Sequence, residues 1–181
     1  MAVYGVFEST NMKSTKGAER IFDAIAETDI ENGTFGYLDG LADGENVTYK
    51  FVAGTADGKQ VVVADNPAWD VDESKKVNQR KDKYIIPAGT RFRVRVVSIN
   101  DEFGISKECV TPATRGTIAV DTYLTIDNAT GKLVASGDST ESAVMEAKVM
   151  RKRICGASLV TASNKYGYSR EIYEAKIITL A

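Results

Sequence analysis

Residues 90–99 read "TRFRVRVVSI", and their alternation decides the fold class. Successive side chains of an extended chain point to opposite sides, so a period of two places one set of residues on each face. Here one set is apolar and the other is arginine: Phe92, Val94 and Val96 against Arg91, Arg93 and Arg95. The pattern predicts a half-buried β-strand that carries a row of arginines about 6.6 Å apart.

Other segments rich in β-branched and aromatic residues predict further strands. They are "NVTYKFVA" (46–53), "KQVVVAD" (59–65), "TIAVDTYLTI" (117–126), "AVMEAKVMRKRI" (143–154) and "REIYEAKIITL" (170–180). Turn-forming residues separate them: "ENGT" (31–34), "LADGEN" (41–46), "ADGK" (56–59), "PAGT" (87–90) and "NATGK" (128–132). Many short strands spaced in this way predict a mainly β fold, either a sandwich or a small barrel.

Helical patterns are few. The segment "KGAERIFDAIAE" (16–27) matches a helical template at Ala18, Ile21, Phe22 and Ile25, but a turn follows at once, which favours a strand. Elsewhere we expect no more than a helical turn or two, around "DSTESAVMEA" (138–147).

The N-terminal residues 1–16 predict an extended arm, because they lack a sustained period. Either this arm is a frayed end, or it orders on a partner that buries its apolar side chains. The second interpretation makes Val3, Tyr4, Phe7 and Met12 partner contacts. We therefore expect that deleting residues 1–15 leaves the body folded and weakens partner binding.

Two β subdomains are predicted after the arm, over residues 17–110 and 111–181. Turn-forming residues cluster between them in "VTPATRG" (110–116). The two can also be continuous as one domain, since 181 residues are enough for one good core.

Composition limits the partners and the compartment. The net charge of −2 gives no general attraction for nucleic acid or an anionic membrane, and no apolar run approaches the ~18 residues of a membrane span. The first residues lack the basic start and apolar core of a signal peptide. Cys109 and Cys155 show no zinc spacing, so we expect two unpaired thiols in a reducing compartment.

The chain contains no histidine, which argues against an enzyme. Histidine is the usual general base near neutral pH and the commonest metal ligand. We expect no catalytic residue, no metal and no cofactor. A small hydrolase that uses Asp or Glu is the catalytic alternative, and convergent carboxylates in a deep pocket would favour it.

The stretch "DNPAWDVDESKK" (65–76) holds the only tryptophan, Trp69, among four carboxylates. An EF-hand calcium loop needs Gly at its sixth position and Glu at its twelfth. Counted from Asp70, these positions are Lys75 and Lys81, and counting from Asp65 fails as well. We interpret the stretch as a structural loop anchored by Trp69, with carboxylates that keep an exposed edge soluble.

The arginine row of residues 91, 93 and 95 has two interpretations. It can face solvent and cross-strand carboxylates, or it can contact an acidic protein surface. A nucleic-acid partner is disfavoured, because stacking aromatic residues are not interleaved with the arginines.

The order of several segments resembles head-associated proteins of tailed bacteriophages, the small β-rich proteins that decorate or stabilise the capsid. The segments are "DIENGTFGYLDGL", "VVVADNPAWDVDESKK", "DKYIIPAGTRFRVRVVSINDEFGIS", "YLTIDNATGKLVAS" and "REIYEAKII". The resemblance covers roughly residues 29 to 181 and is one of pattern: a turn, a "PAG" step into a strand, and a "GKLVA" hairpin.

This resemblance implies a virion structural protein, made in the host cytoplasm, that binds the outside of the major capsid protein shell. It implies many weak contacts repeated by symmetry, no catalytic residues, and an oligomer, for which a trimer is one guess. A phage tail or adaptor component is one alternative. A carbohydrate-binding β-sandwich with Trp69, Tyr166 and Tyr168 as a stacking platform is another.

Overall fold

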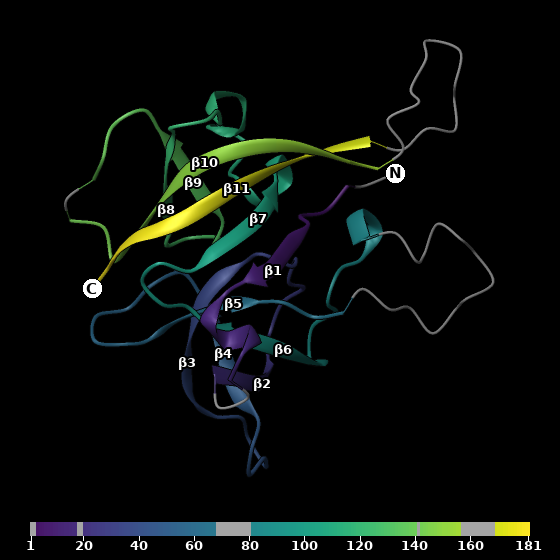
Figure 1. Ribbon diagram of the computed structural model, residues 1–181. Coiled ribbons are helices and arrows are strands. Elements are labelled where there is room, and N and C mark those ends of the chain that lie inside the picture. Colours follow the sequence, from purple (N-terminus) through teal and green to yellow (C-terminus); the bar gives the residue numbers. More distant parts are fainter. Residues whose placement is uncertain (1–2, 18–19, 68–80, 141, 157–168) are drawn as a thin grey trace.

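The computed structural model describes residues 3–17, 20–67, 81–140, 142–156 and 169–181. The protein is mainly β, as predicted, with its described strands arranged in two sheets (Figure 1). The strands are β1 (Phe7–Asn11), β2 (Ile21–Ile25), β3 (Phe35–Leu41), β4 (Tyr49–Ala53), β5 (Val61–Ala64), β6 (Arg91–Val96), β7 (Glu102–Ser106), β8 (Tyr123–Ile126), β9 (Leu133–Ser136), β10 (Met145–Gly156) and β11 (Ser169–Leu180). Within the described ranges, short 3-10 turns join strands at η1 (Lys13–Thr15), η3 (Lys81–Lys83), η4 (Lys107–Cys109) and η5 (Arg115–Thr117).

Five strands form a closed barrel in the order β2-β4-β3-β5-β6. β6 pairs antiparallel with β2, so that Ile21 lies opposite Arg95, while β2 and β4 pair in parallel. The predicted alternation of β6 is confirmed for its apolar residues, since Phe92, Val94 and Val96 are all buried. The segment 16–27 contains β2, which confirms the preference for a strand.

The other six strands form a sheet in the order β1-β7-β11-β10-β8-β9, here called the large sheet. Its centre is the hairpin of β10 and β11, each of 12 residues. The helical turn expected over 138–147 is wrong for the residues described there, because Met145 already begins β10.

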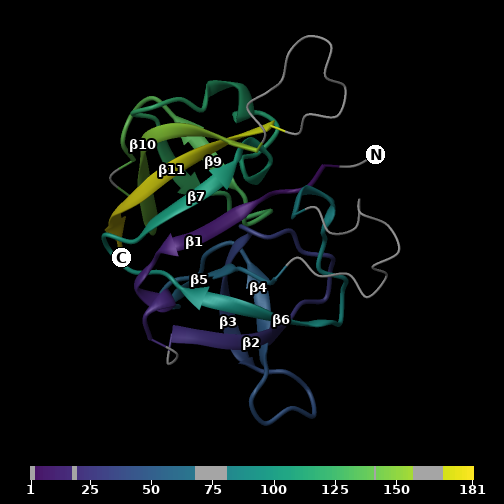
Figure 2. The ribbon, with the colours of Figure 1, turned by 45° about the vertical axis from the view of Figure 1, so that its right-hand side comes forward.

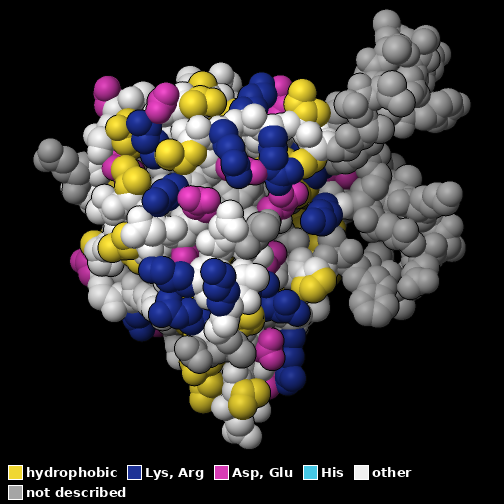
Figure 3. Space-filling view, in the orientation of Figure 1, with side chains coloured by type: hydrophobic (Ala, Val, Ile, Leu, Met, Phe, Trp, Pro, Cys, Tyr) yellow, Lys and Arg dark blue, Asp and Glu magenta, His cyan; other side chains and the backbone are white. Residues whose placement is uncertain are grey.

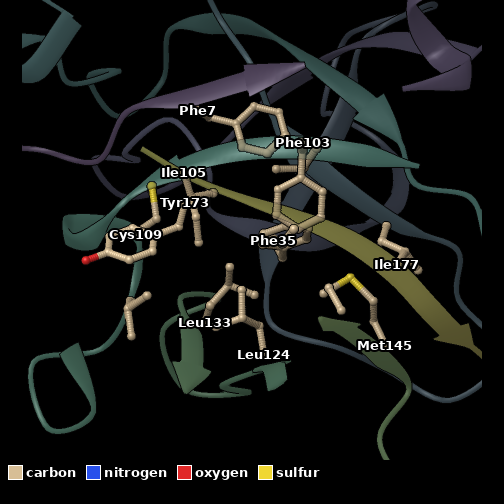
Figure 4. Packing of buried hydrophobic residues seen from close by; sticks show 14 of the residues in the cluster. Phe7, Phe35, Phe103, Ile105, Cys109, Leu124, Leu133, Met145, Tyr173 and Ile177 are labelled. Atoms are coloured by element: carbon tan, nitrogen blue, oxygen red, sulfur yellow. The ribbon is translucent and has the colours of Figure 1, made fainter. Parts of the chain in front are cut away.

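A shared core joins the large sheet to the barrel. The aromatic ring of Phe35, from the barrel, lies 6.4 Å from that of Phe7 and 5.7 Å from that of Phe103, both in the large sheet (centroid distances). Figure 4 shows these three rings among aliphatic side chains of the surrounding strands. A second cluster, which includes Phe51 and Phe92, fills the barrel itself.

The N-terminal segment is not a separate arm, and this corrects the prediction. Residues 7–11 form β1, which pairs antiparallel with β7 as an edge strand of the large sheet and lies between β7 and the barrel (Figure 2). Phe7 and Met12 are buried in the shared core, so the apolar side chains of this segment are satisfied within the chain. The sequence of residues 1–16 shows no sustained hydrophobic period because β1 has only five residues and its register shifts between Glu8 and Asn11.

The two sheets do not follow the boundaries of the predicted arm and the two predicted subdomains. β1 and β7, from the segments 1–16 and 17–110, belong to the same sheet as the strands of 111–181. The chain therefore enters the large sheet, leaves it to build the barrel, and returns at Glu102.

The turn between β8 and β9 attaches the large sheet to the barrel. Its Gly131, with a φ of 68°, accepts a hydrogen bond of 2.8 Å from the Phe35 N–H. A Cβ atom at Gly131 would lie 2.3 Å from the Phe35 carbonyl oxygen, so only glycine fits this approach. On the same turn, Asn128 Oδ1 accepts a 2.6 Å hydrogen bond from the Thr55 hydroxyl.

Candidate functional site

A shallow hollow of about 250 Å³ lies on the large sheet, on the face opposite the shared core. Four strands contribute to it, because one register row runs across β1, β7, β11 and β10 as Glu8, Gly104, Glu174 and Arg151. Figure 3 shows acidic and basic side chains interleaved over this part of the molecule. We call Glu8, Glu174, Arg151 and Arg153 the Arg–Glu cluster.

Arg153 holds the cluster together. It contacts the carboxylate of Glu174 on the neighbouring strand β11, and it also reaches across β11 and β7 to Glu8 on β1. Glu174 is in turn shared with Arg151. An arginine fork suits such contacts, because it offers several N–H donors in one plane.

Gly104 leaves the space through which Arg153 contacts Glu8. It lies on β7, opposite Glu8 on one side and Glu174 on the other. A Cβ atom there would lie 2.9 Å from Ile172 Cγ2 and 3.4 Å from Glu8 Cβ, inside the space that the cluster uses.

The electrostatics of the cluster favour its charged form. Burial raises the pKa of Glu174, but hydrogen bonds from Arg151 and Arg153 outweigh this, and the pKa lies below its ordinary value. Burial lowers the pKa of Arg153, but Glu174 and Glu8 outweigh it and raise that pKa. The four side chains therefore satisfy one another and link β1, β11 and β10.

The β10–β11 ladder of the large sheet contains two bulges. The register shifts between Val149 and Arg151 and again between Glu146 and Ala147. Each shift leaves an apolar residue without a register partner, Met150 on β10 and Ile178 on β11, and both are exposed. Met150 lines a second hollow of about 120 Å³ together with Arg151 and Glu174.

The predicted arginine row is divided between different environments. Arg91 is exposed and contacts Glu45 at 2.5 Å, whereas Arg93 is half-buried. Arg95 is buried and pairs with Asp65, the first carboxylate of the stretch "DNPAWDVDESKK". The row is therefore not one exposed surface, because its last member is used inside the protein.

The four predicted partner contacts of the N-terminal segment also differ in burial. Val3 is exposed and Tyr4 is half-buried, and the Tyr4 N–H donates to the Asp82 carbonyl at 2.9 Å. Phe7 and Met12 are wrong as free partner contacts, because both lie in the shared core. The loop anchor Trp69 lies outside the described residues, as do Tyr166 and Tyr168.

Sequence reasoning missed the Arg–Glu cluster as a unit. The basic run at 151–153 is visible in the sequence, but Glu8 lies 145 positions from Arg153. The available signal was an alternation of Arg151 and Arg153 on a strand, which predicts that their side chains share a face.

Two further observations concern metals and membranes. Within the described ranges, no three or more His, Cys, Asp or Glu side chains form a group that could hold a metal ion. In the same part of the chain, no helix has the length and apolar character needed to cross a bilayer.

Comparisons with known proteins identify no relative. No protein-family model, no curated protein and no solved structure matches the chain.

Proposed function

We propose that the chain is a structural protein of a tailed-phage virion that binds the outer surface of the major capsid shell and stabilises it. Its action is contact rather than catalysis, and it works as an oligomer, for which a trimer is the first arrangement to test. The support from sequence is the order of turns, "PAG" step and "GKLVA" hairpin between residues 29 and 181.

The observation that carries this proposal is the contact chemistry of the large sheet. The Arg–Glu cluster is internally paired, so its charges need no counter-ion, and the exposed Met150 lines a hollow together with Arg151 and Glu174. Arginine and methionine are enriched in protein interfaces, where apolar contacts are surrounded by paired polar groups. Many copies of such a contact, repeated by shell symmetry, give strong total binding from weak individual contacts.

Co-sedimentation with purified mature shells of the phage that encodes the chain tests this function. We expect saturable binding, with a number of copies per shell that matches one class of symmetry position. Bound protein should also raise the temperature at which shells release their DNA. Shells that sediment without the protein at every concentration would refute the proposal and favour a tail or adaptor role.

A glycan screen distinguishes the capsid-binding role from the alternative of a carbohydrate-binding module. A carbohydrate-binding module would bind a sugar in the absence of shells and would lose that binding on substitution of Trp69. A capsid-binding protein should bind shells equally well with or without free sugar.

A further inference from the structure

The segment from Lys13 to Arg20 carries three cations and one carboxylate, a local excess of two positive charges in a chain of net charge −2. Lys13 and Lys16 are exposed, and Arg20 is half-buried. Within the described residues none of these three cations takes part in an ion pair, in contrast to the arginines of the Arg–Glu cluster. Figure 3 shows Lys and Arg side chains gathered below the large sheet on the face where η1 lies.

The base beneath these cations is fixed. The Lys13 N–H donates to Asp101 Oδ1 at 2.9 Å, and the Ser98 N–H donates to Asp101 Oδ2 at 2.9 Å. Asp101 is fully buried, so its carboxylate serves the backbone rather than the surface. Met12 and Ser14, on either side of Lys13, are also buried. The backbone that carries Lys13 is therefore held in place, which lowers the entropy lost when a partner binds.

The same surface holds an exposed apolar side chain. Ile99, in the turn between β6 and β7, is 45% exposed. Its carbonyl oxygen accepts a 2.9 Å hydrogen bond from Lys13 Nζ, and the neighbouring Ser98 hydroxyl accepts one of 2.7 Å from Arg20. An exposed apolar side chain in a turn that binds Lys13 and Arg20 has the composition of a protein contact rather than of a bare electrostatic surface.

From these observations we infer that Lys13, Lys16, Arg20 and Ile99, here called the η1 patch, form a docking surface for a carboxylate-rich protein surface. In the capsid role, on which this inference rests, that surface belongs to the shell. Charge complementarity identifies the occupant, because the local positive excess attracts carboxylates although the chain as a whole is acidic. Nucleic acid fits less well, since the four residues of the patch include no aromatic side chain on which bases could stack.

The test compares two full-length variants with the same change in net charge. In the first, Lys13→Glu and Lys16→Glu reverse the exposed cations of the η1 patch. In the control, Lys50→Glu and Lys59→Glu reverse cations on the barrel, whose exposed partners are Glu27 and Asp39. Urea unfolding first establishes that both variants are folded. We expect the patch variant to bind shells about tenfold or more weakly, with a flatter salt dependence, and the control to bind like the wild type.

The outcomes separate this inference from the capsid proposal. If the wild type and the patch variant bind shells equally well, the η1 patch is wrong as the docking surface, while the capsid role stands. If the wild type does not bind shells, immobilised poly-L-glutamate becomes the probe. Retention of the wild type and the control but not of the patch variant then supports the patch without the capsid. Retention on a DNA duplex alone, or on neither probe, overturns the inference.

Discussion

A Cβ atom on Gly54 would lie 2.4 Å from the backbone carbonyl oxygen of Asn128, so these two residues set how closely the barrel approaches the large sheet. Gly54 follows β4 of the barrel, and Asn128 lies in the turn between β8 and β9. Gly54 also has a φ of 97°, a conformation that side chains with a Cβ rarely adopt.

Gly54→Ala should therefore destabilise the protein by roughly 2 to 4 kcal/mol, the sum of backbone strain and steric overlap. Gly58→Ala is the matched control, because Gly58 has a φ of 69° but no atom within 4 Å of the position that a Cβ would take. Urea unfolding measures both. Equal losses in the two variants would show that the contact with Asn128 has no effect.

Phe7→Ala should cost about 3 to 5 kcal/mol of unfolding free energy, as for other large buried aromatic residues. The reason is that the Phe7 ring contacts those of Phe35 and Phe103 in the shared core. Val3→Ala, at a residue that is 49% exposed, should change stability by less than about 0.5 kcal/mol.

Removal of residues 1–15 should unfold the protein or destabilise it strongly, because it removes β1 from the large sheet. A truncated chain of unchanged stability would contradict the burial of β1.

Asp65→Asn should destabilise the protein by roughly 3 kcal/mol, because it leaves the buried guanidinium of Arg95 without its charged partner. Asp65 also accepts a 2.8 Å hydrogen bond from the Ser9 hydroxyl, so it links β1 to the barrel. In the exposed pair of Lys59 and Asp39, Asp39→Asn should cost less than about 1 kcal/mol. Thermal or urea unfolding of the two variants distinguishes a structural carboxylate from a solvated one.

The Arg–Glu cluster should make stability depend on pH in acid. The pKa of Glu174 in the folded protein lies below its ordinary value of 4.5, so its stabilising effect is complete above 4.5 and is lost as the pH falls through the folded-state pKa. The difference in unfolding free energy between the wild type and Glu174→Gln should therefore shrink as the pH falls below about 4.5. A difference that stays constant across this range would show that Glu174 is not held in its charged form.

The two cysteines should differ in reactivity towards iodoacetamide. Burial raises the pKa of the Cys109 thiol to about 12, so almost no thiolate forms there at neutral pH. Cys155 is half-buried and should be alkylated first in the folded protein. Mass spectrometry of the digested protein measures each site, and urea should make both thiols reactive. Equal labelling of the two in the folded state would be inconsistent with the core position of Cys109.

Sequence patterns predicted the parts of the fold that depend on neighbouring residues, namely strands and turns. The alternation in β6 and the glycines in the turns translate directly into burial and into positive φ values, as at Gly89 and Gly131. The mainly β class and the barrel follow from such signals repeated along the chain.

The remaining features depend on residues that meet only after folding. Nothing near Arg95 in the sequence distinguishes it from Arg91, and its burial depends on Asp65, a residue 30 positions away. The role of Phe7 depends on β7, and the Arg–Glu cluster depends on a register row across four strands. The spacing of Arg151 and Arg153 places the two side chains on one face of a strand, but it cannot reveal partners that lie far away in the sequence.

The placement of β1 also sets an order of events during synthesis. Asn11 pairs with Glu102, which the ribosome adds 91 residues later, and β7 in turn pairs with residues 172–176 of β11. All five strands of the barrel are complete by Val96, before β7 is made. On the nascent chain, Phe7 therefore has no β7 strand to pair with at the stage when all five barrel strands are complete and can already fold. β1 is therefore made before the barrel but can pair with β7 only after the barrel strands are complete, and during that interval it is open to chaperones and to aggregation.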